Sequence, residues 1–368
     1  MFSLLLLASS AVAVPVRRDY TNELLGLAKD KLTFTDGHFK VASFSDMHFG
    51  ERWGNGTWAD WGPANDASTQ RVHATVMDNE HPAYVVLNGD IVTGENLFAD
   101  NATAYLDLAF APNVERGVHF STTHGNHDNA NNINHQQIIE YETSKYGTLS
   151  YTRTDIGPQP WGVGNYCKFS PAWVPVYAVP EDNSPAVIMW FFDSRSFVSG
   201  TGNGPAQLMH DTWGAVPPAL VFTHIPFQLS QELQDLPSPG DHDDAPPAVQ
   251  GFDNDGYNGL DKRTFDALVT AVGASNILAI TSGHDHGNNW CARATASSGV
   301  TLCFDGHSGY GGYTTTNSKV RNGRIFDLTL DGLRAEGGPR VDTWNAYEDG
   351  TTGEQVTLSK DYMSEDNQ

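Results

Sequence analysis

Five short apolar segments of the chain each end in a turn that carries aspartate, asparagine or histidine. In chain order, the segments and the polar residues that follow them are 39–45 with Asp46 and His48, 83–87 with Asp90, 117–123 with Asn126, 219–223 with His224, and 276–281 with His284 and His286. Short apolar runs separated by helical patterns are typical of buried parallel strands. Since chemistry collects at the carboxyl ends of such strands, these turns predict an α/β fold with one polar site.

The segments between these runs predict helices and a single domain. Apolar residues recur at helical spacing over residues 265–272, and residues 68–80 form a second candidate helix. No long linker or internal repeat divides the chain, so we expect one catalytic domain over residues 19–368. A Pro-, Gly- and Asp-rich insertion at about residues 228–259 begins beside His224, and whether it acts as a lid is left open. The tail after about Tyr347 is expected to be solvated and loose.

The composition excludes some classes of partner. The chain has 368 residues, of which 39% are hydrophobic, so it can bury a full core. Its formal net charge of -23 would repel nucleic acid and anionic membranes, so neither a nucleic-acid duplex nor such a membrane is expected as the main partner. Small anionic substrates remain compatible with this charge, because bound metal ions invert the local field.

The N-terminus indicates secretion. Residues 2–12 form a short apolar run, and the small residues of Ala11-Val12-Ala13 match a cleavage site. We therefore expect residues 1–18 to be a signal peptide and candidate propeptide ending at Arg17-Arg18, with a buried N-terminal strand as the alternative. Glycosylation triplets at Asn55 and Asn101 suit a secreted, extracellular or cell-wall protein. No later apolar stretch is long enough to be a membrane span.

The chain has three cysteines, Cys167, Cys291 and Cys303. Cys291 and Cys303 are close enough in sequence to close a short loop as a disulfide, which leaves Cys167 over. Three cysteines scattered in this way do not make a zinc site.

The polar turns together supply seven metal donors: Asp46, His48, Asp90, Asn126, His224, His284 and His286. Imidazole with carboxylate suits Zn, Fe or Mn better than Ca or Mg, which prefer oxygen ligands. Seven donors exceed the needs of one tetrahedral ion, but they match two ions about 3.5–4 Å apart that share a bridging carboxylate. The alternative is a set of unrelated turn residues, which four histidines at separate strand ends disfavour.

This series of motifs resembles the calcineurin-like metallophosphoesterase superfamily over about residues 38–330. The resemblance implies a four-layer α-β-β-α sandwich with two divalent or trivalent transition-metal ions (Zn, Mn or Fe) between the loops of its two sheets. In the ligand assignment that it implies, one metal is held by Asp46, His48 and His286, the other by Asn126, His224 and His284, and Asp90 bridges them.

Further motifs are similar to those of the single-domain, purple-acid-phosphatase-like enzymes of fungi and plants. They are residues 93–96, 284–291 and 306–313. Purple enzymes carry a tyrosine ligand at the position of Thr93, so the resemblance implies a site that is not purple. Ser/Thr protein phosphatases carry an Asp-Arg pair where this chain has Thr93-Gly94, which disfavours a protein phosphatase.

The resemblance also implies a mechanism. A metal-activated hydroxide would attack phosphorus, and His127 would give the leaving oxygen its proton. Asp128 is a candidate to orient His127 or a ligand, with a helix N-cap as the alternative. His307 is a candidate contact of a small phosphate-ester substrate, with a turn-stabilising role as the alternative. Glu95 and Asn96 are candidates either to contact that substrate or to support the residues that do.

Three functions follow, in order of preference. The first is a secreted phosphomonoesterase of the acid-phosphatase type. The second is a phosphodiesterase acting on nucleotide or lipid-type diesters, because the same metal centre serves both reactions. The third is a binding protein that has lost catalysis. The sequence does not determine the physiological substrate, the metal or the oligomeric state.

Overall fold

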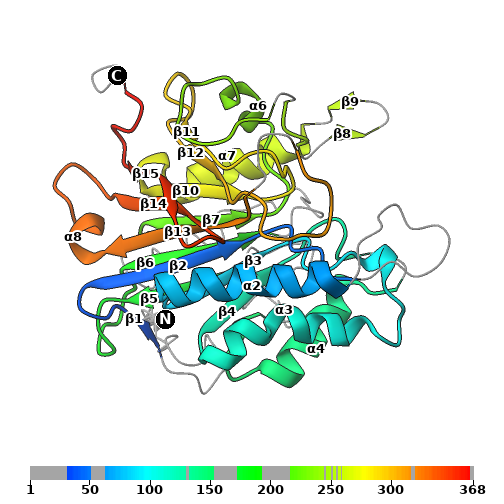
Figure 1. Cartoon of the computed structure of the whole chain (residues 1–368). Coiled ribbons are helices and arrows are strands. Elements are labelled where there is room, and N and C mark those ends of the chain that lie inside the picture. The colour runs from blue at the N-terminus through cyan, green and yellow to red at the C-terminus, as the bar shows by residue number, and fades with distance from the viewer. Residues whose placement is uncertain are drawn as a thin grey trace, which may run out of the picture.

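The computed structural model describes residues 31–50, 63–129, 132–152, 172–192, 216–243, 246–249, 252–253, 256–257, 259–315 and 320–364. The predicted signal peptide and propeptide (residues 1–18), Cys167 and Asn55 lie outside these residues. Within them, two large β-sheets lie face to face, and helices cover the outer face of each (Figure 1).

Six of the described strands form one sheet in the order β15-β14-β13-β2-β3-β4. Their bounds are β2 (His38–Phe44), β3 (Tyr84–Asn88), β4 (His119–Thr123), β13 (Asn322–Thr329), β14 (Val341–Tyr347) and β15 (Thr352–Leu358). The strands β2, β3 and β4 are parallel, whereas β13 is antiparallel to β2. All five residues of β3 are buried, which explains why it reads as a continuous apolar run.

Seven described strands form the other sheet in the order β1-β5-β6-β7-β10-β12-β11. Their bounds are β1 (Leu32–Thr33), β5 (Ala172–Tyr177), β6 (Val187–Phe192), β7 (Ala219–Thr223), β10 (Ile277–Ser282), β11 (Cys291–Arg293) and β12 (Thr301–Phe304). The central strands β6, β7, β10 and β12 are parallel. A separate small hairpin pairs β8 (Phe252–Asp253) with β9 (Gly256–Tyr257).

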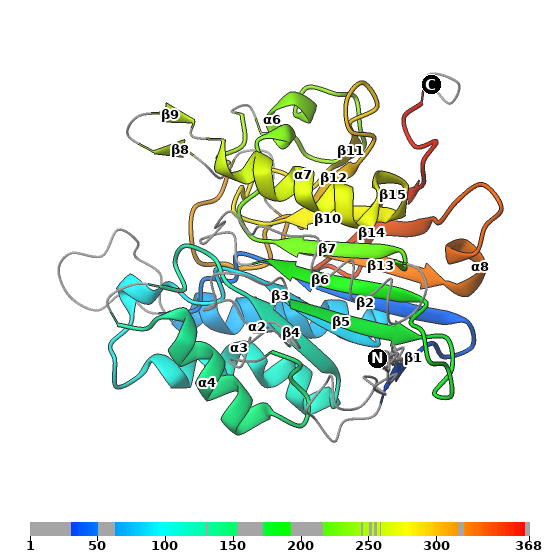
Figure 2. The same cartoon turned by 180° about the vertical axis from the view of Figure 1, so that it is seen from behind.

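Helices form the two outer layers (Figures 1 and 2). The described helices are α2 (Pro63–Glu80), η1 (Gly94–Asn96), α3 (Ala102–Arg116), α4 (His135–Tyr146), α6 (Leu229–Leu233), α7 (Leu260–Val272), η3 (Ala274–Asn276) and α8 (Leu330–Leu333). Local signals fix their ends. Gly117, with φ 63°, ends α3, and Asn134 with Gln137 forms a capping box at the start of α4.

Three apolar layers hold the sandwich together. One fills the space between the sheets, where Phe39 and Tyr84 face Val174 and Phe222. A second lies between the six-stranded sheet and the helices α2, α3 and α4, and a third packs α7 against the outer face of the seven-stranded sheet. Two sheets between two helical layers confirm the predicted α-β-β-α fold.

The described part of the insertion at 228–259 is fastened to the chain beside the predicted ligands. The side-chain oxygen of Asn288 accepts hydrogen bonds from Gln234 Nε2 at 3.0 Å and from the Asp243 backbone at 2.8 Å. The ring of His242 stacks on Trp290 with centroids 5.3 Å apart. Residues 234–243 of the insertion therefore pack on the sandwich, and the helix α6 precedes them.

The chain beyond Tyr347 was expected to be loose, and this is wrong. After a turn at Gly350, β15 pairs with β14 in antiparallel register from Val341↔Leu358 to Ala346↔Thr352. Most residues of β15 are only partly buried because it is the edge strand, so its sequence lacks the apolar run that marks the inner strands.

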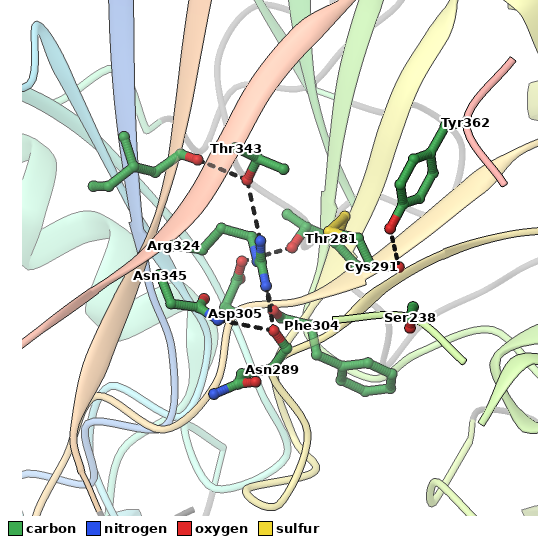
Figure 3. Close-up of a disulfide and its surroundings, with 12 residues drawn as sticks. Ser238, Thr281, Asn289, Cys291, Phe304, Asp305, Arg324, Thr343, Asn345 and Tyr362 are labelled. Carbon is green, nitrogen blue, oxygen red and sulfur yellow. Dashed lines mark hydrogen bonds between the residues drawn. A yellow bond between two sulfur atoms is a disulfide. The ribbon is translucent and has the colours of Figure 1, made fainter. Parts of the chain in front are cut away.

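Cys291 and Cys303 form a disulfide between β11 and β12, where they lie directly opposite each other (Figure 3). Asn101, the described glycosylation triplet, is partly exposed just before α3. Among the residues that the structure describes, no helix has the length and apolar character needed to cross a membrane.

Candidate metal centre

The turns at the ends of β2, β3 and β10 hold unusual backbone conformations. Asp46, His48, Asp90 and His284 have φ values of 55°, 49°, 47° and 72°, in the left-handed region that aspartate and histidine enter more readily than most residues. Backbone bonds tie the first two turns together, from Asp46 N to Gly89 O at 3.1 Å and from His48 N to Asp90 O at 2.9 Å. The turns thereby aim four predicted ligands into one space between the sheets.

Asp46, His48 and His286 form the first cluster, with ligand atoms all within 4.8 Å of one another. His286 Nε2 lies 3.3 Å from Asp46 Oδ1 and 3.3 Å from His48 Nε2. All three side chains are buried. Two imidazole nitrogens that face each other and a carboxylate have the arrangement of ligands around a shared cation.

Asp90, His224 and His284 form the second cluster by the same criterion. His224 Nε2 lies 3.0 Å from Asp90 Oδ2, and His284 is only partly buried. The two clusters adjoin, because His48 Nε2 is 3.8 Å from Asp90 Oδ2 and His224 Nε2 is 3.8 Å from Asp46 Oδ1. Asp90 thus reaches the imidazoles of both clusters, as its predicted bridging role requires.

The other ring nitrogen of three histidines is held by an oxygen. Nδ1 of His224 donates to the Asn88 carbonyl at 2.9 Å, and Nδ1 of His286 donates to the Tyr313 carbonyl at 2.6 Å. Nδ1 of His48 lies 2.9 Å from the hydroxyl of Thr93. A proton on Nδ1 leaves Nε2 free as a lone-pair donor, which is the state that metal ligands need.

Asn126 completes the donor set beside the second cluster. Its neighbour Gly125 abuts Asp90 and His224 so closely that a Cβ atom there would overlap both side chains. Within the described part of the chain, Oδ1 of Asn126 is buried and has no hydrogen-bond partner. A buried amide oxygen without a partner is costly, so this atom fits a ligand for a cation. The residues present therefore fit two transition-metal ions.

The electrostatics of the clusters favour metal-binding forms. Burial opposes charge on Asp46 and Asp90, but the neighbouring histidines outweigh it and lower the pKa of both carboxyls. Burial lowers the pKa of His48 to about 3, so its ring is neutral. For His224 burial also favours the neutral ring, but Asp90 and Asp46 prevail and raise its pKa to about 10. A cation would take over the role of that proton between the two carboxylates.

His127 lies at the open side of the second cluster. Its backbone N–H donates to Asp90 Oδ1 at 2.8 Å, and its side chain is 26% exposed. Nδ1 lies 2.5 Å from Glu95 Oε1. Burial lowers the pKa of His127, but the hydrogen bond to Glu95 and the charge of Asp90 outweigh it and raise the pKa overall. A partly exposed imidazole whose pKa is raised keeps its proton to a higher pH than a free imidazole, which suits a general acid.

Residues 39–288 match the family model described as calcineurin-like phosphoesterase. The chain belongs to this family. The match includes all seven predicted ligands, from Asp46 to His286, and it spans the strands that carry them.

Similar proteins include phosphatases of plants and yeast. The chain is 28% identical over 353 residues to a protein of Arabidopsis thaliana named probable inactive purple acid phosphatase 28, covering 85% of this chain and 81% of that protein. It is 24% identical to phosphatase DCR2 of Saccharomyces cerevisiae, covering 80% of this chain and 52% of that protein. A dimetal phosphatase from Danio rerio has the same fold, with a TM-score of 0.54 at 13% identity, covering 88% of this chain and 99% of that one.

The structure separates the two roles predicted for Asp128, to orient His127 or to orient a ligand. Its two oxygens accept hydrogen bonds from the backbone of Gly125 at 2.8 Å and of Val92 at 3.0 Å. Burial, with the charge of Asp90, raises the pKa of Asp128 to about 6. Asp128 therefore braces the turn that carries the predicted ligand Asn126, whereas the carboxylate that contacts His127 is Glu95. The N-cap alternative is wrong, because α4 begins at His135 behind Asn134.

Two of the predicted substrate contacts are buried in the phosphoesterase. His307 is fully buried, its Nε2 donates to the Gly311 carbonyl at 3.0 Å, and its ring packs on His286 with centroids 3.9 Å apart. Asn96 is 2% exposed. Neither side chain reaches solvent in this conformation, which favours the alternative of a turn-stabilising role for His307 over a contact with substrate. His307 instead supports a ligand from behind.

Tyr313 was not singled out from the sequence. Its ring lies parallel to that of His286, with centroids 3.9 Å apart, and the residue is 47% exposed. An exposed aromatic ring beside the first cluster forms part of the rim of the site. The signal that could have found it is the run of glycines around Tyr310 and Tyr313, which lets the backbone pass close to the ligands.

A buried polar network lies next to the second cluster, and Figure 3 shows the part of it around Asp305, Thr281 and Arg324. Asp305 accepts hydrogen bonds from Asn88, Ser43 and Thr281 at 2.6, 2.9 and 2.6 Å, and so joins the two sheets. Arg324, also buried, donates to the Phe304 carbonyl at 2.7 Å. Since Asn88 also receives the hydrogen bond from His224, this network helps to position the second cluster.

Proposed function

We propose that this phosphoesterase is a secreted, dinuclear-metal phosphomonoesterase in which His127 donates the proton to the leaving oxygen. The observation that carries the proposal is the pair of adjoining clusters with a partly exposed, carboxylate-held His127 at their edge. Two ions in such clusters supply Lewis acidity and a nucleophile at neutral pH. The family membership and the relatives named phosphatases support this class of reaction.

The chain's own residues have separate tasks in this proposal. Asp46, His48 and His286 would hold one ion, Asn126, His224 and His284 the other, and Asp90 both. His127 would carry its proton on the ring nitrogen that Glu95 does not contact, toward the substrate. A poor leaving group needs that proton most, because an alkoxide leaves as a strong base.

The variant His127→Ala tests the assignment. We expect it to keep both metals and to lose roughly 10²–10⁴-fold in rate on alkyl phosphates, with a smaller loss on aryl phosphates. His38→Ala is a matched control, because His38 is exposed at the far end of β2 from Asp46. Unchanged turnover of alkyl phosphates by His127→Ala would contradict the role of His127.

The choice of monoester over diester rests on relatives named phosphatases rather than on a contact in the site. Rates on 4-nitrophenyl phosphate and bis(4-nitrophenyl) phosphate, each with Zn²⁺, Mn²⁺ or iron added, would decide it. We expect the monoester to be the better substrate. Faster cleavage of the diester would establish the phosphodiesterase alternative instead.

A binding protein without catalysis is the remaining alternative, since three relatives from Arabidopsis thaliana are named probable inactive purple acid phosphatase. The complete donor set and the adjoining His127 favour an enzyme. Metal analysis after reconstitution tests this point. Two bound ions per chain are expected, and a protein that binds none would be assigned to the third class.

The secreted location is proposed from the apolar run at residues 2–12 and the two glycosylation triplets. A disulfide between Cys291 and Cys303 suits an oxidising compartment. Expression of the full chain in a eukaryotic host tests the proposal. We expect the protein in the medium, processed within or just after residues 1–18, with glycans at Asn55 and Asn101. Retention inside the cell with an intact N-terminus would contradict it.

A further inference from the structure

One short turn lies between the metal ligand His48 and the candidate acid His127. The hydroxyl of Thr93 lies 2.9 Å from Nδ1 of His48, and two residues later Glu95 Oε1 lies 2.5 Å from Nδ1 of His127. The two imidazole rings are themselves neighbours, with centroids 5.1 Å apart and planes at 67°. The turn at residues 93–95 therefore contacts each of the two rings at its Nδ1 atom.

The backbone of the turn is fixed from both sides. Thr93 N donates to the Phe49 carbonyl at 2.9 Å, on the chain that carries His48. Gly94 N donates to the carbonyl of His127 at 3.0 Å. The 3-10 helix η1 then begins directly and directs the side chain of Glu95 to His127. The two segments that it joins are far apart in sequence, so the turn sets their relative position.

In the described part of the chain, three ligand histidines have an oxygen partner for Nδ1. Only the partner of His48, the hydroxyl of Thr93, belongs to a side chain. His224 and His286 use the backbone carbonyls of Asn88 and Tyr313, which a mutation cannot remove. Thr93 and His48 are both fully buried, so water does not readily replace the hydroxyl. Loss of such a partner frees the ring to turn, so that Nε2 no longer faces the metal in the orientation that a ligand needs.

We propose that the turn at residues 93–95 is a positioning device shared by the two histidines: Thr93 fixes the orientation of the His48 ring for metal binding, and Glu95 fixes the orientation of His127 for proton transfer. The part that concerns Thr93 requires only a metal site. The part that concerns Glu95 rests on the proposed function, in which His127 acts as the acid.

Metal titration of the metal-free protein tests the first part. Thr93→Val keeps the shape and removes the hydroxyl, and we expect it to weaken one of two equivalents of Zn²⁺ by roughly 10–100-fold. Thr93→Ser restores the hydroxyl and should restore the affinity. Thr152→Val is the matched control, because Thr152 is equally buried and its hydroxyl accepts from Thr122 N at 2.9 Å, away from both clusters.

Two results would overturn this part. One is an unchanged affinity for both equivalents in Thr93→Val. The other is an equal loss of affinity in Thr152→Val, which would indicate a general effect of buried threonines. If Thr93→Val does not fold, Thr93→Ala with Thr93→Ser provides the same comparison.

Kinetics test the second part. Glu95→Ala should slow hydrolysis of an alkyl phosphate by about 10–100-fold, within the range of general acid catalysis, and an aryl phosphate less. Glu95→Gln keeps an acceptor oxygen and should recover part of the rate. In the His127→Ala background, Glu95→Ala should add nothing, because residues that act as a unit are not additive. Glu80→Ala is the control, since Glu80 pairs with Lys40 far along α2.

Equal losses on both esters, or additive losses with His127→Ala, would overturn the role of Glu95. If the protein hydrolyses no phosphate ester, the proposed function fails, but both positioning roles can still be tested without an activity assay. The Zn²⁺ affinity of the Thr93 variants tests the role of Thr93. Nitrogen NMR decides Glu95, because Glu95→Ala should shift the tautomer balance of His127, and an unchanged spectrum would contradict the proposal.

Discussion

The two ligand clusters use the same kinds of donor but differ in their surroundings. In the first, all three side chains (Asp46, His48 and His286) are buried, and the glycine-rich segment at 307–313 packs over it so closely that a Cβ atom on Gly312 would lie 2.7 Å from His286. The second, Asp90, His224 and His284, is partly open and adjoins the exposed edge of His127.

This difference indicates a division of roles. We expect an ion in the first cluster to exchange slowly, because its ligands are all buried, and an ion in the second cluster to be more accessible to solvent and substrate. Burial, rather than donor chemistry, separates the two. The variants below test whether the clusters differ as their surroundings indicate.

The largest effect is expected for Asp90→Ala, which removes the carboxylate that reaches both clusters. We expect both ions to bind weakly and turnover to fall on the order of 10⁴-fold, as for other groups that act as a unit. Metal analysis and rates on an aryl phosphate measure this. Asp327→Asn, on the partly exposed pair with His38, is the control. Loss of only one ion would show that Asp90 serves one cluster.

The next effect separates the clusters. His286→Ala should lose the ion of the first cluster and His284→Ala that of the second. Each variant should bind one equivalent more than about 100-fold more weakly, since even the loss of a residue that only holds a ligand in place costs 10–100-fold. Exchange against a chelator should show the slow ion missing in His286→Ala and the fast ion missing in His284→Ala. Identical exchange curves would refute the proposed asymmetry.

Metal removal should lower stability by a smaller amount. At a free metal concentration of 100 times the dissociation constant, each bound ion adds about 2.7 kcal/mol to the free energy of unfolding. Thermal unfolding with and without a chelator measures this contribution. Because the first cluster is more enclosed, we expect its ion to supply most of this stabilisation. A chelator should therefore lower the melting temperature of His284→Ala, which keeps that ion, far more than that of His286→Ala, which lacks it. A melting temperature independent of chelator would contradict metal binding by the folded chain.

The smallest effect is expected outside the site, at Asp107 between α3 and α4. Burial favours its neutral form, but hydrogen bonds from Lys145, Tyr141 and Tyr146 outweigh this and lower the pKa of Asp107. A carboxyl whose pKa is lower in the folded state stabilises the fold fully at pH values above its unfolded pKa of about 3.9. This stabilisation is lost as the pH falls through its pKa in the folded state. Asp107→Asn should therefore cost less than about 1 kcal/mol at pH 7 and nothing at the acid end.

Urea unfolding of Asp107→Asn and the native chain at several pH values from neutral to strongly acidic provides the measurement. A difference that grows on acidification would have the wrong sign. This exposed network gives a baseline, since its pH dependence should be the same with and without metal.

The strand ends could be predicted because their signal is local. Each inner strand is a short apolar run followed by a polar turn, so the ligands of β2, β3 and β10 follow from the sequence around them. The edge strand β15 could not, since a half-exposed strand lacks that run. Its pairing depends on β14, which the turn at Gly350 brings alongside it.

The supporting residues of the site were harder to predict. Asp128 is next to His127 in sequence, yet its carboxylate turns to the backbone of Gly125 and Val92. Glu95 is 32 residues away and makes the contact, because the η1 turn returns the chain to His127. Adjacency in sequence therefore misled, and only the fold shows which carboxylate faces the imidazole. The burial of His307 could not be predicted for a similar reason, because it depends on the loop around that residue.

The left-handed backbone conformations of Asp46, His48, Asp90 and His284 lower the stability of the metal-free chain, although the side chains at these positions are needed to bind the metals. Each such residue costs roughly 1 kcal/mol that glycine would not, and the two carboxylates add the cost of a buried charge. Glycine at any of these positions would relieve strain in the metal-free chain while removing a ligand. Screening for heat resistance without metal would therefore enrich inactive variants. A thermostable form of this protein should be sought with the metals present and these four positions held constant.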